Sequence, residues 1–139
     1  MSGIIEPGEA KRQLAESSPL FSSFWQAQEA EWEEDGGIPS TVLFGDFAFE
    51  VSKEIDRLAP VELTSLFATL EYLLVHGNQQ VGEIIATGFL EALLAAVGNG
   101  ELDIEKVKPY LGPESVEYCV AWDLKTFSGN AGPADRQSG

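Results

Sequence analysis

The sequence predicts an all-α protein, a compact bundle of five to six helices around a central apolar helix. Three observations support this prediction. Apolar residues recur three or four positions apart along most of the chain, which is the spacing of a helix with one buried face. Proline and glycine interrupt this spacing at intervals of about one helix length. No segment alternates apolar and polar residues over a long span, and only residues 41–44 have short β-favouring character.

Two helices are expected at the start of the chain. Residues 6–17 form a short polar helix, and Pro7 suits its first turn because that position needs no backbone donor. Ser18 is the predicted N-cap and Pro19 the first residue of a second helix, which extends to residue 35. The second helix carries an aromatic stripe, made of Leu20, Phe21, Phe24, Trp25 and Trp32.

Two further helices follow the break at residues 36–39. The third is expected over residues 40–58, and its core face is predicted to consist of Phe44, Phe47, Val51, Ile55 and Leu58. The fourth begins at Pro60 and ends near His76, with Gly77 as the residue that follows its C-cap. Its core positions are predicted to be Leu63, Leu66, Phe67, Leu70, Leu73 and Leu74.

The remaining helices include the predicted centre of the bundle. Residues 79–97 are apolar nearly all round, which is typical of a central helix, and Gly88 allows a neighbouring helix to approach closely. A short helix is expected over residues 103–110 and a last one over residues 113–127. Val116, Cys119, Val120 and Leu124 are predicted to face inward from this last helix. Residues 1–128 are expected to form one domain, and residues 129–139 a disordered tail.

Composition excludes several classes of protein. The chain of 139 residues has 8 Lys and Arg against 23 Asp and Glu, a net charge of −15, with 44% hydrophobic residues. It can therefore bury a core, and it lacks the clustered cations that bind a nucleic-acid backbone. A single cysteine excludes a disulfide scaffold. With no signal-peptide pattern and no apolar run expected to span a bilayer, we predict a cytoplasmic protein without a membrane partner.

The sequence offers few groups for catalysis or metal binding. His76, the only histidine, lies at a predicted helix end, and Cys119 lies among apolar residues. Setting Gly100 at the sixth position of a calcium loop places Lys106 where a bidentate glutamate is required. Glu50 and the carboxylate four residues later share a helix face but lack the Glu-x-x-His motif of di-metal bundles. We therefore expect no catalytic residues, no metal site and no cofactor.

The distribution of charge is the most informative feature. Eight acidic residues and no basic ones occur between Arg12 and Lys53. Five of these acids surround a tryptophan near the end of the second helix, where the helix dipole disfavours negative charge. The predicted partner-binding residues are this group together with two acids of the third helix: Glu29, Glu31, Trp32, Glu33, Glu34, Asp35, Asp46 and Glu50. Solubility alone also explains such acidity, and Trp32 could instead complete the core stripe.

Three segments resemble a known family. They are Leu43-Phe44-Gly45-Asp46-Phe47, Phe89-Leu90-Glu91-Ala92-Leu93-Leu94, and Tyr110-Leu111-Gly112-Pro113 with Trp122 downstream. Together they resemble a family of short acidic bacterial proteins of uncharacterised function, some similar to immunity proteins of polymorphic toxin systems. The resemblance covers residues 35–128, leaves the acidic aromatic helix outside, and implies no catalytic residues.

Three functions follow as hypotheses. The first is an immunity-type protein that binds a cognate bacterial toxin, a basic enzyme such as a nuclease, and blocks its active site with carboxylates. The second is a nucleic-acid mimic that inhibits a DNA-binding protein. The third is a small metal-dependent helical enzyme, which would need His76 and several glutamates to converge. The identity of the toxin and the oligomeric state do not follow from the sequence.

Overall fold

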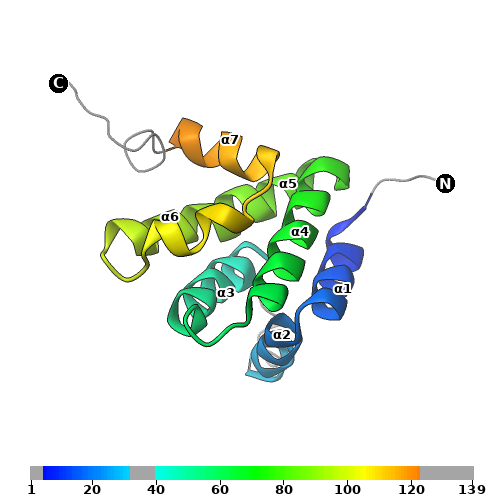
Figure 1. The fold of residues 1–139 in the computed structure, drawn as a ribbon. Coiled ribbons are helices and arrows are strands. Elements are labelled where there is room, and N and C mark those ends of the chain that lie inside the picture. Colours follow the sequence, from blue (N-terminus) through cyan, green and yellow to red (C-terminus); the bar gives the residue numbers. More distant parts are fainter. Residues whose placement is uncertain (1–4, 32–39, 123–139) are drawn as a thin grey trace.

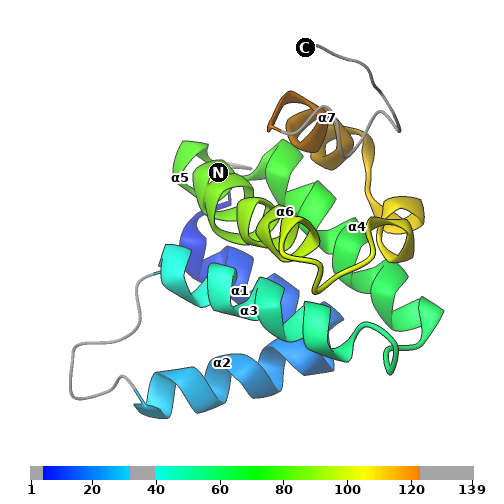
Figure 2. The same ribbon diagram turned by 90° about the vertical axis from the view of Figure 1, so that its left-hand side faces the viewer.

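The computed structural model describes residues 5–31 and 40–122, and in these ranges the chain is all-α, as predicted. Figure 1 shows α4 crossing in front of α3. Helix α1 lies beside the lower half of α4, and α7 lies near the upper end of α4. Figure 2 shows α2, α3, α6 and α7 stacked in that order from the bottom of the view to the top. The buried apolar residues of these helices form one core cluster.

The first two helices begin at the predicted prolines, and the expected end of the second at residue 35 lies outside the described residues. Helix α1 spans Pro7–Ser17 and α2 spans Pro19–Glu31. The Ser18 hydroxyl accepts a hydrogen bond from the backbone N–H of Phe21 at 3.1 Å, which confirms the predicted N-cap. Phe21 is fully buried, whereas the other described members of the stripe pack against the core with part of their surface exposed. Trp32 lies outside the described residues.

Helices α3 and α4 present the predicted core faces. Helix α3 spans Ser40–Glu54 and α4 spans Pro60–His76. Helix α3 ends four residues before the expected boundary at Leu58, because the chain tightens into a turn in which the N–H of Arg57 bonds to the carbonyl of Glu54 at 2.8 Å. Of the predicted core positions, only Leu58 and Leu74 are partly exposed, and the others are buried.

Gly77 ends α4 in a different way from the one expected. Its backbone is extended, with φ −74° and ψ 161°, and is not left-handed. A Cβ at this position would lie 2.4 Å from Cγ1 of Val81 and 2.5 Å from the carbonyl oxygen of Leu73. The same residue forms an isolated parallel bridge with Ile5. Glycine is required here because the backbone approaches its neighbours closely, which local sequence rules do not reveal.

The central helix runs without a break through three segments. They are α5 (Gln79–Glu83), the π-helical stretch η2 (Ile84–Leu90) and α6 (Glu91–Gly98). A Cβ on Gly88 would lie 3.1 Å from the carbonyl oxygen of Thr41 and 3.2 Å from Cβ of Phe44. This confirms the predicted close approach of a neighbouring helix, which is α3.

The same helix corrects one expectation about membranes. Residues Gln79–Gly98 are long and apolar enough to cross a bilayer by length and composition, with a mean hydropathy of 1.7. Glu83 and Glu91 interrupt the run, so the segment is not an unbroken apolar stretch. More than half of the apolar window is buried inside the protein. Packing at the centre of the bundle accounts for this composition.

The C-terminal part differs from the prediction in one element. Residues 103–110 form two 3-10 turns, η3 (Ile104–Lys106) and η4 (Lys108–Tyr110), in place of one α-helix. Pro109 lacks the N–H that a continuous α-helix would need at that position. Helix α7 spans Pro113–Trp122, and the expected residues 123–127, with Leu124, lie outside the described part, as does the predicted tail.

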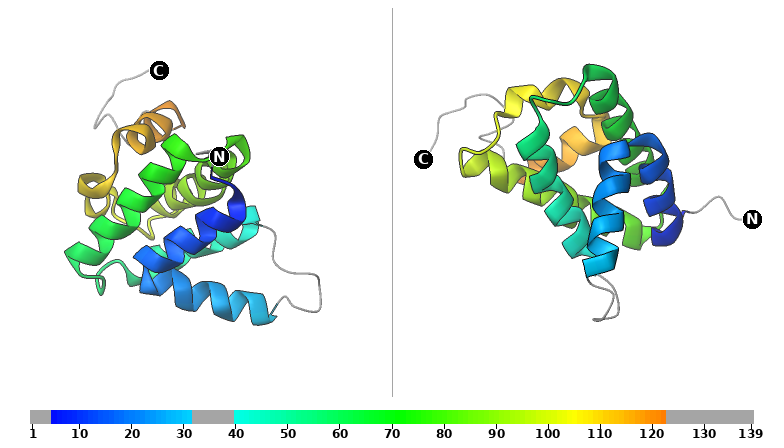
Figure 3. Two further views of the ribbon diagram at one scale, coloured as in Figure 1. Left: turned by 90° about the vertical axis from the view of Figure 1, so that its right-hand side faces the viewer. Right: turned by 90° about the horizontal axis from the view of Figure 1, so that it is seen from below.

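A chain of aromatic contacts joins four of these elements. The ring of Phe47 lies 4.9 Å from that of Phe21 in α2 and 5.9 Å from that of Phe89 in η2. Phe89 in turn lies 5.9 Å from Phe67 in α4. Figure 3 shows from the side how α1 and α2 lie against α4 and α3 around this centre. These ring contacts pack α2, α3, η2 and α4 against one another, and the outer faces of these helices carry exposed polar and apolar side chains.

Candidate protein-binding surface

The two groups with nucleophilic or basic chemistry lie in different settings. Cys119 of α7 is fully buried, and this burial raises the pKa of its thiol to about 12, so the reactive thiolate is disfavoured. His76 is exposed at the end of α4, where its ring lies 4.4 Å from the ring of Tyr72. In the described part of the chain, no three His, Cys, Asp or Glu side chains gather closely enough to hold a metal ion.

The predicted acidic cluster is described only at its beginning. Glu29 is exposed, and its carboxylate accepts a hydrogen bond from the indole N–H of Trp25 at 2.9 Å. Glu31 is exposed at the last turn of α2. The other predicted members, Trp32, Glu33, Glu34 and Asp35, lie outside the described residues. The two glutamates that can be placed therefore sit on the surface, as a partner-binding role requires.

The outer face of α3 combines acidic and apolar side chains. Asp46 is exposed and lies between the exposed side chains of Val42 and Phe49, at helical spacings of four and three residues. Asp46 has no hydrogen-bonding or ionic partner among the described residues. Glu50, one turn further along, is partly exposed and pairs with Lys53 at 3.4 Å. We call Val42, Asp46, Phe49 and Glu50 the α3 face.

Helix α3 packs beside α2, the helix that carries the first residues of the acidic cluster. Figure 2 shows α2 and α3 side by side, with the C-terminal end of α2 on the same side as the start of α3. The structure thus places Asp46 and Glu50 on a helix next to the one that carries Glu29 and Glu31. Sequence reasoning missed Val42 and Phe49 as surface residues. The sequence does indicate their exposure, because neither residue lies at the spacing of three or four that defines the core face of this helix.

Positive charge in the described part is largely neutralised by acidic neighbours. Arg12, Lys53, Arg57, Lys106 and Lys108 each pair with an Asp or Glu, and Lys106 and Asp56 are 2.5 Å apart. Lys11 lies over the ring of Trp25, 5.8 Å from its centroid. These cations are thus already engaged, and carboxylates dominate the charge that remains on the described surface. Exposed pairs of this kind add little stability.

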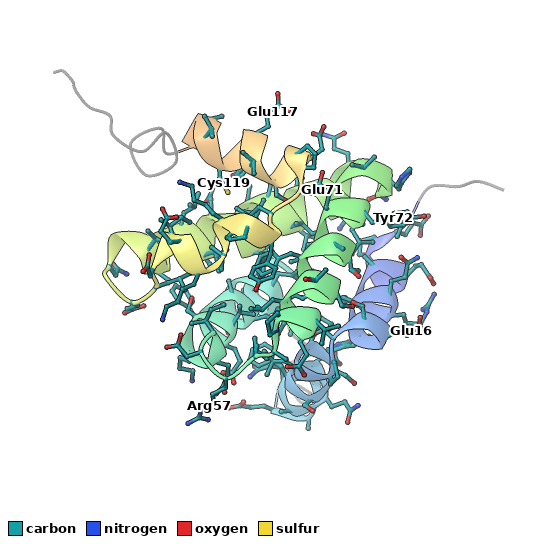
Figure 4. The ribbon with its side chains drawn as sticks, in the orientation of Figure 1. Glu16, Arg57, Glu71, Tyr72, Glu117 and Cys119 are labelled. Atoms are coloured by element: carbon teal, nitrogen blue, oxygen red, sulfur yellow. The ribbon has the colours of Figure 1, made fainter. Side chains whose placement is uncertain are left out.

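Two other carboxylates hold the fold together. The side chain of Glu71 in α4 accepts hydrogen bonds from the backbone N–H groups of Glu114 and Ser115 at 2.8 and 3.0 Å, and from the Ser115 hydroxyl at 2.9 Å. It therefore caps the start of α7. A Cβ on Gly112 would lie 2.4 Å from the Glu71 side chain, so glycine leaves room for the cap. Figure 4 shows Glu71 at this junction and Glu117 on the outer side of α7.

The second structural carboxylate is Glu91 of α6. It accepts a hydrogen bond from the Tyr118 hydroxyl of α7 at 3.1 Å. Burial, and then this hydrogen bond, raise the pKa of Tyr118 to about 12. Gly45 lies in a similar close contact, since a Cβ there would be 3.4 Å from the carbonyl oxygen of Gly88. The three segments that carry the family resemblance therefore contain residues of helix–helix junctions.

The fold and these surfaces define an all-α domain with an apolar core, a carboxylate-rich exterior and apolar side chains exposed between the acids. The model of the DUF7674 family, a domain of unknown function, matches residues 12–127. The chain belongs to this family. The match begins well before residue 35, so α2 lies inside the family domain, contrary to the expectation that it falls outside. Searches of curated proteins and of solved structures give no match.

Proposed function

We propose that the protein is an immunity-type protein that binds a cognate bacterial toxin with a basic surface and blocks its active site. The observation that carries this proposal is the α3 face, where the carboxylate of Asp46, which has no partner among the described residues, lies between the exposed Val42 and Phe49. Protein interfaces typically have an aromatic or apolar centre within a polar rim. The α3 face supplies both kinds of group, the apolar Val42 and Phe49 with the acids Asp46 and Glu50, and the neighbouring α2 adds the exposed Glu29 and Glu31.

The electrostatics explain why the partner is expected to be basic. Two acids one turn apart on a helix, such as Asp46 and Glu50, repel each other by a few tenths of a kcal/mol. In a chain with a net charge of −15, many such repulsions add up and destabilise the folded state. A basic partner removes the repulsion and gains attraction, and long-range attraction also speeds the encounter. A toxin that acts on anionic substrates such as nucleic acids presents this kind of basic groove.

The test begins with a toxin encoded beside the gene for this protein. Co-expression with the protein should restore the growth of cells that produce this toxin, and cells that die equally with and without it would refute the proposal. A captured partner that is a DNA-binding protein without toxin activity would favour the nucleic-acid mimic instead.

The contribution of the α3 face is measured by association kinetics with the purified toxin. The Asp46→Asn, Phe49→Ala variant should associate more slowly and dissociate faster, because one change removes long-range attraction and the other removes a contact. A matched variant, Glu101→Gln, removes an exposed acid beyond the end of α6 and should change the on-rate little. Equal effects of the two variants would exclude the α3 face.

A further inference from the structure

A second row of exposed apolar side chains lies on α4. Val61, Tyr72 and Val75 are 74%, 50% and 53% exposed, and Ala68 is exposed between them. Their positions are separated by seven, four and three residues, which places all four along one side of the helix. At 1.5 Å per residue the row is about 21 Å long. Single exposed apolar residues are common, but an aligned row on one helix marks a contact surface.

A groove runs beside this row where α1 meets α4. It has a volume of about 510 Å³, and it is lined by Glu9, Gln13 and Glu16 from α1 and by Ala68, Thr69 and Tyr72 from α4. The hydroxyl of Ser65 in α4 donates to the carbonyl of Ser17 in α1 at 2.9 Å and ties the two helices together. Figure 4 shows Tyr72 and Glu16 on the same side of the molecule. The groove and the apolar row thus form one continuous surface.

The charges in the groove are suited to a cation. Glu9 accepts hydrogen bonds from Gln13 and Arg12. These hydrogen bonds, chiefly the one from Gln13, hold the pKa of the Glu9 carboxyl below its usual value. Glu16 is exposed and has no partner among the described residues. Helix α4 contains no Lys or Arg. Arg12, four residues before Glu16 in α1, pairs with Glu9, and Glu16 forms no ion pair among the described residues.

We propose that this surface binds a basic amphipathic helix of a partner protein. The apolar side of that helix would cover Ala68, Tyr72 and Val75, and a Lys or Arg at its edge would reach Glu16 and the face of the Tyr72 ring. The straight row and the adjoining groove fit the manner in which an amphipathic helix binds between two helices, with contacts every three or four residues. The surface lies on α1 and α4, so this proposal is independent of the α3 face.

The experiment uses the full chain and two synthetic peptides. One is an 18-residue amphipathic helix of leucine and lysine, and the other has glutamine in place of each lysine. Titration calorimetry and the amide shifts of the 15N-labelled protein report affinity and location. The lysine peptide should bind and should shift signals of α1 and α4. No binding, equal binding of the two peptides, or shifts centred on α3 would overturn the proposal.

A variant of the groove and a control variant elsewhere on the surface provide the comparison. Glu16→Gln with Tyr72→Ala removes one acid and one aromatic ring from the groove, and it should weaken binding about tenfold, equivalent to about 1.4 kcal/mol. The control Glu117→Gln removes an exposed acid from α7, which belongs to neither proposed surface, and it should weaken binding less than about twofold. Equal weakening by both variants would overturn the proposal. So would a dimer of the free protein that dissociates in Tyr72→Ala, because a second copy would then be the occupant.

Discussion

The cap that Glu71 provides to α7 predicts that Glu71→Ala destabilises the protein by about 2–4 kcal/mol. The carboxylate accepts three hydrogen bonds, two of them from Ser115, which is only 2% exposed. Loss of a capping acceptor costs about 1 kcal/mol, and a buried donor left without a partner costs about 1–3 kcal/mol. Glu71→Ala leaves both the N–H and the hydroxyl of Ser115 without their acceptor.

The effects of substitutions at Gly112 and Glu71 on stability should not be additive. This coupling distinguishes loss of the cap from a simple loss of packing. A Cβ on Gly112 would lie 2.4 Å from Cγ and Cδ of Glu71, so Gly112→Ala must displace that side chain. Its cost, about 1–3 kcal/mol, therefore cannot exceed the cost of losing the cap. In the Glu71→Ala background the space is free, and Gly112→Ala should be neutral or slightly stabilising because it restricts the unfolded chain.

Urea unfolding followed by circular dichroism at 222 nm measures the two single variants and the double variant. The double variant should be about as stable as Glu71→Ala, so the coupling energy equals most of the cost of Gly112→Ala. Glu117→Ala, which removes an exposed acid from the same helix, serves as the control and should change stability by less than about 0.5 kcal/mol. Additive effects of Glu71→Ala and Gly112→Ala would refute the cap.

Four further predictions follow from the structure. Gly88→Leu should destabilise by about 1–3 kcal/mol or more, because α3 leaves no space at that position. Gly82→Ala, which meets nothing within 4 Å, should stabilise by about 0.5–1 kcal/mol, and equal thermal melts of these two variants would contradict the packing. Absorbance at 295 nm should show that Tyr118 ionises near pH 12. Because folding favours the neutral phenol, its contribution to stability is present below about pH 10 and is lost as the pH rises towards 12; ionisation near pH 10 in the folded protein would disprove it. Cys119 should react with a thiol reagent only upon unfolding, and rapid labelling of the native protein would show that the thiol is accessible. Raising sodium chloride from 0.1 to 1 M should raise Tm, because the Debye length falls from about 10 to about 3 Å and screens the repulsion among carboxylates; a steady fall in Tm would count against this reasoning.

The acidic surface illustrates how far a site can be predicted without coordinates. The sequence shows which residues carry charge, and the predicted positions Asp46 and Glu31 are indeed exposed. It does not show which carboxylates are already used by the fold. Glu71 and Glu91 appear in the sequence as ordinary acids of two helices, but in the structure both bind groups of α7. A candidate site is therefore defined only after these structural roles are removed.

The sequence by itself determined the elements that depend on local spacing. The N-cap at Ser18, the helix starts at Pro19 and Pro60, and the core faces of α3 and α4 all follow from interactions within one or two helical turns. Residues 103–110 were expected to form one α-helix but form two 3-10 turns, although Pro109, which lacks an N–H, is itself a local signal against a continuous helix. Tertiary structure alone decided which helices meet. Glu71 caps α7 through Glu114 and Ser115, which lie 43 and 44 positions further along the chain. Gly112 and Gly77 leave space for their neighbours, and Phe49 and Tyr72 are exposed, because of the same contacts between helices. Contacts between distant residues arise from the packing of whole helices, and no local pattern in the chain encodes them.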